Sequence, residues 1–399
     1  MIFFKKCATT LVALAALAAT ASFAQSSVTI YGNLDQAMYR QKEDGKSLSD
    51  INSNSATTST LGFKGSEDLG SGLSANFNLL SELSMKEGRM GSTTTGTAAT
   101  GQTPDIFTRG ATVGVASKAW GSLDVGRVTD SAWVTQGTLN NTGLNSFGWN
   151  ALTATSGNPG ATNGQGVFSG KTTTDTTFSG TTTTAAGVTG TGNTAQTGSS
   201  PLNFGGGVSY TSPNLGGLVA SVQSFGSNNS SNAIKTGNGM SYSLNYTTGD
   251  LRVVFGNTYR NGSDGAKATS FTVYGAEYKM GKYTFVGGVT KQKYEGTMAT
   301  LDDLTVTGLG IGYDLTPQIE LKAGYTTMKD DEQDGYKTNL TAVTARYKFS
   351  ARTSMYAGYG TGKNTGANNK QSIFYGANTV ALQGAQSLTG MMVGIKHSF

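Results

Sequence analysis

Few residues of this chain have the types and spacing that enzyme chemistry requires. His397 is the only histidine and lies two residues from the end, and Cys7 is the only cysteine. No Ser–His or Cys–His pair can be built around them, so a lipase or another covalent mechanism has little support. Residues 360–363 resemble a phosphate-binding loop only in part, because alanine replaces its first glycine and asparagine follows its lysine. We therefore predict that the protein is not an enzyme and needs no cofactor.

Two acidic clusters deserve separate consideration. Asp302 and Asp303 form one, and residues 330–332 form the other. Neither has the ligand spacing of a calcium loop. Solvated loop acids are the preferred interpretation, with divalent cations that bridge lipopolysaccharide as the alternative, and we predict no metal site.

Other charged residues alternate with apolar ones, which would place them on the wet side of strands that have one oily face. In that position they would act as an electrostatic filter for passing solutes. The residues opposite each strand's aliphatic stripe are Asp35, Lys64, Glu82, Arg252, Glu320, Lys322, Arg346, Lys348, Arg352 and Lys396.

Two arginines break this pattern. Arg109 shares its parity with Val113, and Arg127 shares its parity with Val125. Either the strand ends before each arginine or a bulge intervenes, since a one-residue slip moves a side chain to the other face. Arg109 has a further alternative, a position at a subunit interface.

These side chains would be carried by sixteen short alternating strands, each close to the length that a tilted strand needs to cross a bilayer. The expected strands are 27–41, 57–66, 73–84, 108–118, 122–127, 203–211, 217–225, 240–247, 251–260, 270–280, 283–294, 304–315, 319–329, 337–349, 352–361 and 388–399.

Composition agrees with a barrel that has a wet interior. The chain is 36% hydrophobic and 13% charged, against about 45–50% and 25% in soluble domains. Disorder is one explanation, but 17 Tyr and 17 Phe argue against it. A barrel needs apolar residues only on its outer face. The fold class expected is therefore all-β, a 16-stranded antiparallel transmembrane barrel.

The first 24 residues have the pattern of a signal peptide. Lys5 and Lys6 precede a short apolar run, and the segment ends in Ser22-Phe23-Ala24. Cleavage after Ala24 would give a barrel of residues 25–399. Without those two lysines, the formal charge falls from +5 to +3. That near balance argues against a nucleic-acid partner.

The expected connections alternate between short turns, such as residues 281–282, and long polar links, such as 42–56 and 85–107. Residues 128–202 form the longest link, with Asp130, Lys171 and Asp175 as its charged residues. Connections of this length are usually functional or disordered. We expect residues 130–149 to enter and narrow the lumen, and most of residues 161–200 to lie outside as a Thr/Gly-rich insertion.

Several motifs resemble the trimeric general porins of the β-proteobacterial type. They are Ser27-Val28-Thr29-Ile30-Tyr31-Gly32, Leu61-Gly62-Phe63-Lys64-Gly65-Ser66-Glu67-Asp68-Leu69-Gly70, Trp120-Gly121-Ser122-Leu123-Asp124-Val125-Gly126-Arg127, Val208-Ser209-Tyr210-Thr211-Ser212-Pro213-Asn214-Leu215-Gly216-Gly217 and Gly394-Ile395-Lys396-His397-Ser398-Phe399. They span the mature chain in order. The resemblance implies an outer-membrane location, a homotrimer and a third loop folded inward.

The resemblance also implies an arginine cluster on the wall that faces acids on the third loop. Arg127 matches one family arginine, whereas Thr60 and Asn203 stand near two other arginine positions, and no Pro-Glu-Phe-type acidic motif is present. The arginine cluster on the wall and the acidic group on the third loop therefore both carry less charge than the family pattern, so we expect weak charge selectivity. The pore-lining candidates are Arg127, Lys64, Asp35, Asp130, Arg109, Arg252, Lys322, Arg346, Lys348 and Arg352.

The last strand resembles the signal that the barrel-assembly machinery recognises, through Gly394, His397 and Phe399. Parity also predicts an outward stripe made of Met391, Val393, Ile395, His397 and Phe399.

Passive diffusion of small hydrophilic solutes is the main functional expectation. A porin specific for organic acids or sugars is the first alternative. A porin whose surface loops also act as an adhesin or receptor is the second.

Overall fold

Eighteen strand segments form one ring. The computed structural model describes residues 27–43, 46–90, 106–149, 151–152, 203–226, 238–261, 266–295, 303–332, 335, 337–366 and 387–399. The expected signal peptide and residues 161–200 lie outside this part of the chain. The segments are β1 (Ser27–Glu43), β2 (Lys46–Ser53), β3 (Thr60–Gly70), β4 (Leu73–Ser84), β5 (Arg89–Met90), β6 (Gly110–Ser117), β7 (Gly121–Thr129), β8 (Asn203–Thr211), β9 (Leu218–Phe225), β10 (Gly239–Thr248), β11 (Leu251–Asn261), β12 (Lys267–Met280), β13 (Tyr283–Tyr294), β14 (Leu304–Asp314), β15 (Ile319–Asp330), β16 (Lys337–Lys348), β17 (Thr353–Thr365) and β18 (Ser387–Ser398).

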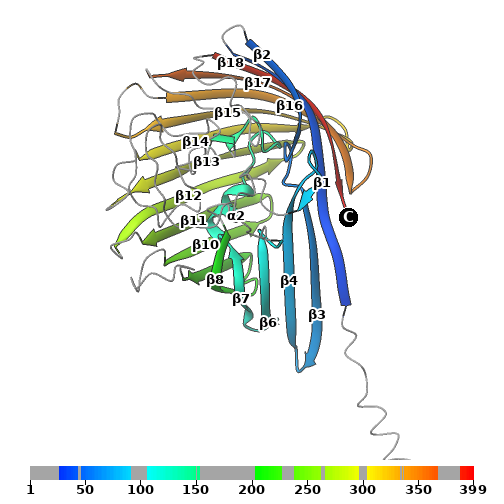
Figure 1. The fold of residues 1–399 in the computed structure, drawn as a ribbon, viewed down its shortest axis with the longest axis vertical. Helices are drawn as coiled ribbons and strands as arrows, with labels where there is room; N and C mark the ends of the chain where they lie inside the picture. Colours follow the sequence, from blue (N-terminus) through cyan, green and yellow to red (C-terminus); the bar gives the residue numbers. More distant parts are fainter. Residues whose placement is uncertain are drawn as a thin grey trace, which may run out of the picture.

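These segments make sixteen barrel strands. The first half of β1 pairs with β3 and its second half pairs with β2, so β2 and β3 together occupy one strand position. β5 pairs only with the end of β4, whose neighbour in the ring is β6. β18 pairs antiparallel with β1 and closes the ring of described strands, so the first and last strands cover each other's edges (Figure 1). The prediction of a 16-stranded antiparallel barrel is confirmed.

The main difference from the expected strands lies near the N-terminus. Residues 42–56 were expected to form a long polar link, but β1 continues to Glu43 and β2 returns along it as a regular antiparallel pair. The predicted turn at residues 67–72 is also tighter, because β3 continues to Gly70. Only Ser71 and Gly72 remain between β3 and β4, with φ values of 52° and 78°.

Alternation along each strand separates an apolar outer face from a polar inner face. Met38, Val343 and Met391 on the outer face are 65%, 52% and 50% exposed, while their sequence neighbours Ala37, Ala342 and Met392 are buried. Exposed aromatic residues gather near the short turns: Trp120, Tyr210, Tyr246, Tyr278, Tyr283, Tyr347, Phe349 and Phe399. Such a girdle is typical of the interfacial level of a membrane barrel.

The third loop runs inside the ring. It leaves β7 and forms the short helix α2 (Ser131–Gly137), which lies within the barrel close to β10, β11 and β12 (Figure 1). Residues 138–149 continue along the inner wall toward β17. This confirms the expected inward fold of the loop. In the part of the chain that the structure describes, no helix is long and apolar enough to cross a membrane.

Candidate functional site: the third loop docked inside the barrel

Asp130 anchors the start of the third loop. It precedes α2, and its Oδ1 accepts hydrogen bonds from the backbone N–H groups of Ala132 (2.8 Å) and Trp133 (3.4 Å), as an N-cap residue does. The same oxygen accepts from the hydroxyls of Ser241 on β10 (2.7 Å) and Thr258 on β11 (2.6 Å). Burial raises the pKa of this carboxyl group. The contacts make Asp130 a buried attachment point, and its predicted role in solute selection stays a prediction.

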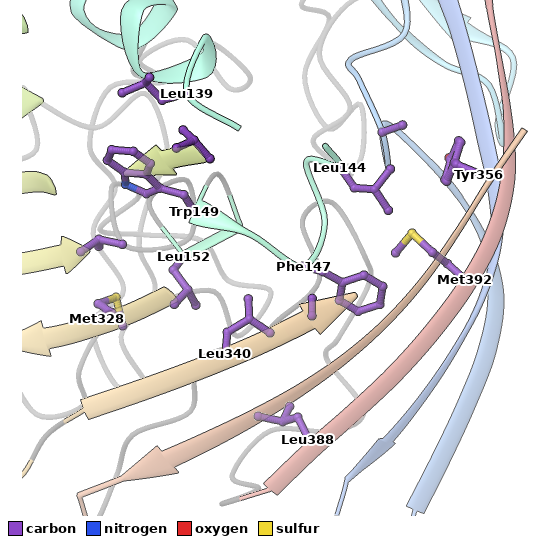
Figure 2. Close-up of a cluster of buried hydrophobic side chains, with 14 of the residues drawn as sticks. Leu139, Leu144, Phe147, Trp149, Leu152, Met328, Leu340, Tyr356, Leu388 and Met392 are labelled. Atoms are coloured by element: carbon purple, nitrogen blue, oxygen red, sulfur yellow. The ribbon is translucent and has the colours of Figure 1, made fainter. Parts of the chain in front are cut away.

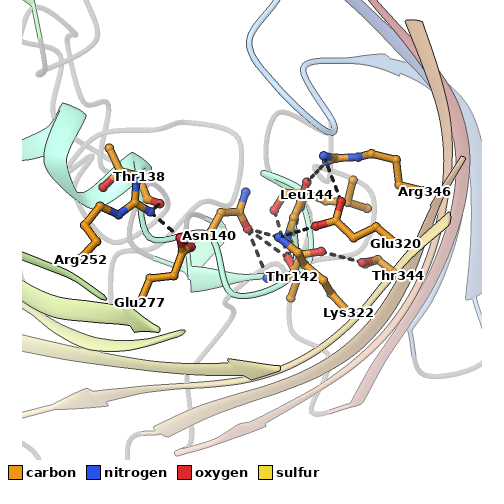
Figure 3. Close-up of polar contacts among 11 residues, drawn as sticks. Thr138, Asn140, Thr142, Leu144, Arg252, Glu277, Glu320, Lys322, Thr344 and Arg346 are labelled. Carbon is orange, nitrogen blue, oxygen red and sulfur yellow. Dashed lines mark hydrogen bonds and ion pairs between the residues drawn. The ribbon is translucent and has the colours of Figure 1, made fainter. Parts of the chain in front are cut away.

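Two wall arginines hold the loop by its main chain. Arg252 on β11 donates to the carbonyl oxygen of Thr138 at 2.6 Å, and Arg346 on β16 donates to that of Gly143 at 2.5 Å (Figure 3). The hydroxyl of Thr344 donates to the neighbouring carbonyl of Thr142 at 2.6 Å. Hydrogen bonds from charged donors are stronger than neutral ones, so these contacts fix the path of the loop.

The same basic residues form ion pairs along the wall. Arg252 lies 3.3 Å from Glu277, Lys322 lies 3.1 Å from Glu320, and Arg346 lies 3.5 Å from the second oxygen of Glu320 (Figure 3). Two cations therefore share one carboxylate beside the loop, which leaves a local excess of positive charge. Three predicted pore-lining residues, Arg252, Lys322 and Arg346, are thus found beside the loop.

Glycines in the wall make room for the large side chains of the loop. An added Cβ on Gly308 would lie 3.0 Å from the Trp149 ring, and one on Gly360 would lie 2.6 Å from the Phe147 ring. Both rings are fully buried (Figure 2). The Nε1–H of Trp149 also donates to the Thr290 hydroxyl at 3.0 Å. The loop therefore docks as a packed core, with aromatic rings in slots that only glycine leaves open.

Asn141 attaches the loop to the wall between the contacts of these two rings. Its side-chain nitrogen donates to the hydroxyl of Thr326 at 3.0 Å and to the carbonyl of Leu309 at 3.1 Å. An added Cβ on Gly310 would lie 2.8 Å from the Asn141 Cβ. Gly308 and Gly310 on β14 therefore make room for the third loop. Gly312, by contrast, faces the Lys322 side chain.

Asp35 is buried rather than open to the lumen. Its carboxylate accepts from the backbone N–H groups of Ala56 (2.6 Å) and Thr57 (3.0 Å) and from the hydroxyl of Tyr356 (2.5 Å). Asp35 on β1 thereby holds the segment between β2 and β3 and also contacts β17. Lys396, on the inward parity of β18, pairs in register with Asp35. These contacts favour a structural role for Asp35, and its effect on solutes stays untested.

Lys64 on β3 lies beside an aromatic ring of β1. The Lys64 ammonium lies 4.8 Å from the centre of the Tyr31 ring, and the Tyr31 hydroxyl donates to Asn78. A cation over an aromatic face is attracted by the ring's quadrupole. Lys64 is thus positioned on the inner face as parity predicts.

The two arginines with ambiguous parity have different explanations. β6 begins at Gly110, so Arg109 precedes the strand. Its guanidinium pairs with inward-facing Glu82 at 2.8 Å. Arg127 stays in register with Ala111 on β6, and the register shift lies on its β8 side, next to Gly126 with φ 135°. Its Nε donates to the Thr108 carbonyl at 2.7 Å. Arg127 therefore keeps the parity of Val125, and its predicted place in the pore stays a prediction.

Lys348 and Arg352 lie at the short-turn end. Lys348 is the last residue of β16 and shares the inward parity of Arg346. Arg352 was expected on a strand, but β17 begins at Thr353 and Arg352 lies in the preceding turn, exposed, where its N–H donates to the Ser350 hydroxyl at 3.1 Å.

The three residues of the expected assembly signal lie on β18 and just after it. His397 contacts the Thr353 hydroxyl at 2.9 Å, and Phe399 exchanges backbone hydrogen bonds of 3.1 Å with Gly32. Gly394 faces inward, where an added Cβ would collide with Tyr356. The predicted outward stripe is present, with Met391, Val393, Ile395, His397 and Phe399 exposed.

The sequence analysis did not predict a docking site made of the glycines that face Trp149 and Phe147 and of the arginines that bind loop carbonyls. A glycine on the inward parity of a strand is a usable signal for a slot, whereas a main-chain carbonyl leaves no mark in a sequence. Among the described residues, no group of three or more His, Cys, Asp or Glu is arranged to hold a metal ion.

A closed barrel with an inward third loop defines a class of membrane channel proteins, and comparison with known proteins specifies the family. A sequence model described as Gram-negative porin matches residues 8–367. The chain therefore belongs to the Gram-negative porin family, a family of outer-membrane β-barrels.

Individual relatives agree with this assignment. The outer membrane porin protein 32 of Delftia acidovorans is 46% identical over 76 residues, which is 18% of this chain and 22% of that protein. An outer membrane porin protein of Bordetella pertussis is 34% identical over 140 residues, 31% of this chain and 34% of that protein. These alignments thus span about a third or less of each relative's length.

Solved structures extend the likeness to the whole fold. The anion-selective porin from Comamonas acidovorans superposes with a TM-score of 0.67 at 22% identity, covering 94% of this chain and 100% of that one. The trimer form of OmpT from Vibrio cholerae gives 0.56 at 14% identity, covering 94% and 99%. At these identities the comparison concerns the fold alone.

Proposed function

We propose that this protein is a passive, water-filled channel for small hydrophilic solutes and ions, with weak charge selectivity. The observation that carries the proposal is the docked third loop, which narrows the lumen with a segment that has no charged side chain from residue 131 to residue 152. A barrel with an apolar outer face and a polar inner face gives solutes a wet path across the membrane.

Weak selectivity follows from what the wall arginines face. Arg252 and Arg346 point at loop carbonyls and share carboxylates on their own wall, so no carboxylate of residues 131–152 stands opposite them. Carbonyl dipoles produce a weaker transverse field than carboxylates would, and the excess of wall cations favours a small preference for anions.

Reversal potentials of the purified protein in a planar bilayer under a salt gradient test this proposal. We expect a small shift toward anions. A Val134→Glu variant, which adds a carboxylate at an exposed position of α2, should move the reversal potential toward cations and serves as the sensitivity control. A large anion preference in the unmodified channel contradicts weak selectivity, and silent bilayers contradict the channel itself.

We also propose a homotrimer. The trimer form of the structurally similar OmpT and the resemblance to trimeric porins support it. Conductance that rises in steps of three, together with the mass of the detergent-solubilised protein by light scattering, tests this assignment. A monomeric mass with single steps contradicts it.

Gly394, His397 and Phe399 are proposed to guide insertion by the barrel-assembly machinery. Because Gly394 also makes room for Tyr356, only Phe399 gives a clean test of recognition. A Phe399→Ala variant should insert poorly in cells yet fold in detergent. Normal insertion in cells contradicts the assignment.

A further inference from the structure

Three aromatic rings and one arginine gather on the inner wall beside α2. We call these four residues the mouth cluster: Trp133, Phe225, Arg260 and Phe271. Phe225 is the last residue of β9, Arg260 is the last but one of β11, and Phe271 lies in the first half of β12. Trp133 belongs to α2, which lies inside the barrel beside these strands (Figure 1). The cluster therefore lies at the end of the barrel away from the short turns.

Parity places the cluster on the inner face of the wall. Phe271 is two residues from Val273, a buried residue of the core that the docked loop forms, and Phe271 packs against that core. Arg260 is two residues from Thr258, whose hydroxyl donates to Asp130 of the loop. Because side chains two apart on a strand point to the same face, Phe271 and Arg260 both point into the barrel.

The arginine is held over an aromatic face. Its guanidinium carbon lies 5.5 Å from the centre of the Phe225 ring. Gly239 on β10 lies between them, because it pairs in register with both Phe225 and Arg260. An added Cβ on Gly239 would lie 2.5 Å from the Phe225 ring. The glycine thus lets the ring reach across one strand to the arginine, which the ring quadrupole then attracts.

The other two rings form a platform beside the arginine. The Trp133 and Phe271 ring centres lie 5.9 Å apart, with an interplanar angle of 52°. Phe271 pairs with Thr258, so it is the diagonal neighbour of Arg260 on the same face, at a separation that long and aromatic side chains can bridge. Trp133, Arg260 and Phe271 are all partly exposed. Val134, next to Trp133, is 52% exposed, so the platform opens to the lumen.

The platform lies on one side of the docked loop. Leu139 of the loop packs at Gly275, where an added Cβ would lie 2.5 Å from its side chain. Phe271 is two inward positions further along β12 from Gly275, in the direction away from the short turns. A solute that enters from that end therefore meets the mouth cluster before it meets Leu139 and the rest of the loop.

Asp130 is the acid of the loop that interacts with Arg260. Its Oδ1 already accepts four hydrogen bonds, from two backbone N–H groups of α2 and from the hydroxyls of Ser241 and Thr258. A guanidinium carries five N–H donors in a planar fork that matches a carboxylate. Arg260 can therefore keep its contacts within the protein and also donate to a carboxylate in the lumen.

We propose that the mouth cluster binds small aromatic carboxylates, with the solute ring against Trp133 and Phe271 and its carboxylate at Arg260. The proposal names a solute class for the channel and therefore rests on the proposed function. Aromatic rings attract one another through offset or tilted contacts in addition to the area they bury. An aliphatic acid lacks those ring contacts, and a neutral aromatic lacks the charged hydrogen bond, so each should bind more weakly.

The first test compares three solutes on the unmodified protein. Titrations in neutral detergent, followed by fluorine NMR of the solute, would give the affinity of 4-fluorobenzoate for the full mature chain. We expect saturable binding, and affinities at least fivefold lower for 4-fluorobenzamide and for 4-fluorocyclohexanecarboxylate. Equal affinity of either analogue would overturn the proposal. This comparison needs no substitution, so it holds whatever a variant does to folding.

The second test locates the site. Arg260→Gln and Phe271→Leu should each bind 4-fluorobenzoate at least fivefold more weakly than the unmodified protein. Tyr31→Leu is the matched control, because it removes another inner ring with a cation over it, the Lys64 ammonium at 4.8 Å. This control should bind as the unmodified protein does. Unchanged affinity in both cluster variants, or an equal loss in the control, would overturn the assignment to the mouth cluster.

Conductance of the same preparations separates this proposal from the proposed function. Open channels that bind 4-fluorobenzoate no better than its two analogues reject the mouth cluster alone. Silent bilayers of the unmodified protein reject the channel itself.

Discussion

Replacing Trp149 with alanine is expected to release the third loop from the inner wall. The Trp149 ring is fully buried over Gly288 and Gly308, and its Nε1–H bonds Thr290. Burial of about 150–250 Å² at about 25 cal/mol per Å² gives roughly 4–6 kcal/mol as an upper value. Measured costs of core Trp→Ala changes are about 3–5 kcal/mol. At about 1.4 kcal/mol per factor of ten, the undocked population should rise roughly 100- to 5,000-fold.

Thiol labelling measures that population. Cys7 is the only cysteine and lies in the expected signal peptide, so a Ser146→Cys background places a single thiol in the mature protein at a fully buried loop position. Trp149→Ala should raise its labelling rate by at least two orders of magnitude and make single-channel current noisier. Val134→Ala, at an exposed position of the same loop, should change neither. An unchanged labelling rate in the Trp149 variant would refute the docking argument.

Three further predictions use the same labelled background. Gly360→Val should raise labelling at least tenfold, because even an added Cβ would lie 2.6 Å from the Phe147 ring; unchanged labelling would mean that the slot tolerates side chains. Arg346→Gln should raise labelling about tenfold, since it removes a charged hydrogen bond to Gly143, and should shift the reversal potential toward cations. Burial raises the pKa of Asp130, so docking is strongest below the ordinary carboxyl pKa of about 4 and weakens as pH rises through the raised value. The labelling rate of Cys at position 146, divided by that of a free thiol at the same pH, should therefore increase with pH when Asp130 is present. The same ratio should stay constant with pH in the Asp130→Asn variant. A ratio that stays constant with Asp130 present would contradict the role of the Asp130 carboxyl group in docking.

Most of the barrel was predictable because each strand repeats a simple alternation of apolar and polar residues. Strands such as Tyr283–Tyr294 match their expected bounds. β2 was missed because its sequence is polar and serine-rich, and it is held in place by pairing with β1 rather than by an apolar face of its own. Sequence alternation reports burial, so a strand stabilised mainly by backbone pairing gives little signal.

The docking of the third loop was predictable only in outline. Its length and position indicated an inward path. The partners of Arg252 and Arg346 could not be found from sequence, because they are carbonyl groups of Thr138 and Gly143 that any residue would supply. Asp130 was predicted to line the constriction, and that role stays a prediction. Its contacts as a helix cap could not be found from sequence, because a sequence does not show which backbone N–H groups a carboxylate meets.

The use of main-chain oxygens at Thr138 and Gly143 has a consequence for how this pore can vary. The identities of those two residues matter less than the course of the backbone through them, so side chains there are open to replacement while Arg252 and Arg346 are not. Exchanging side chains at these two positions can therefore change which solutes the pore prefers. The hydrogen bonds from Arg252 and Arg346 to the loop's main chain would remain in place.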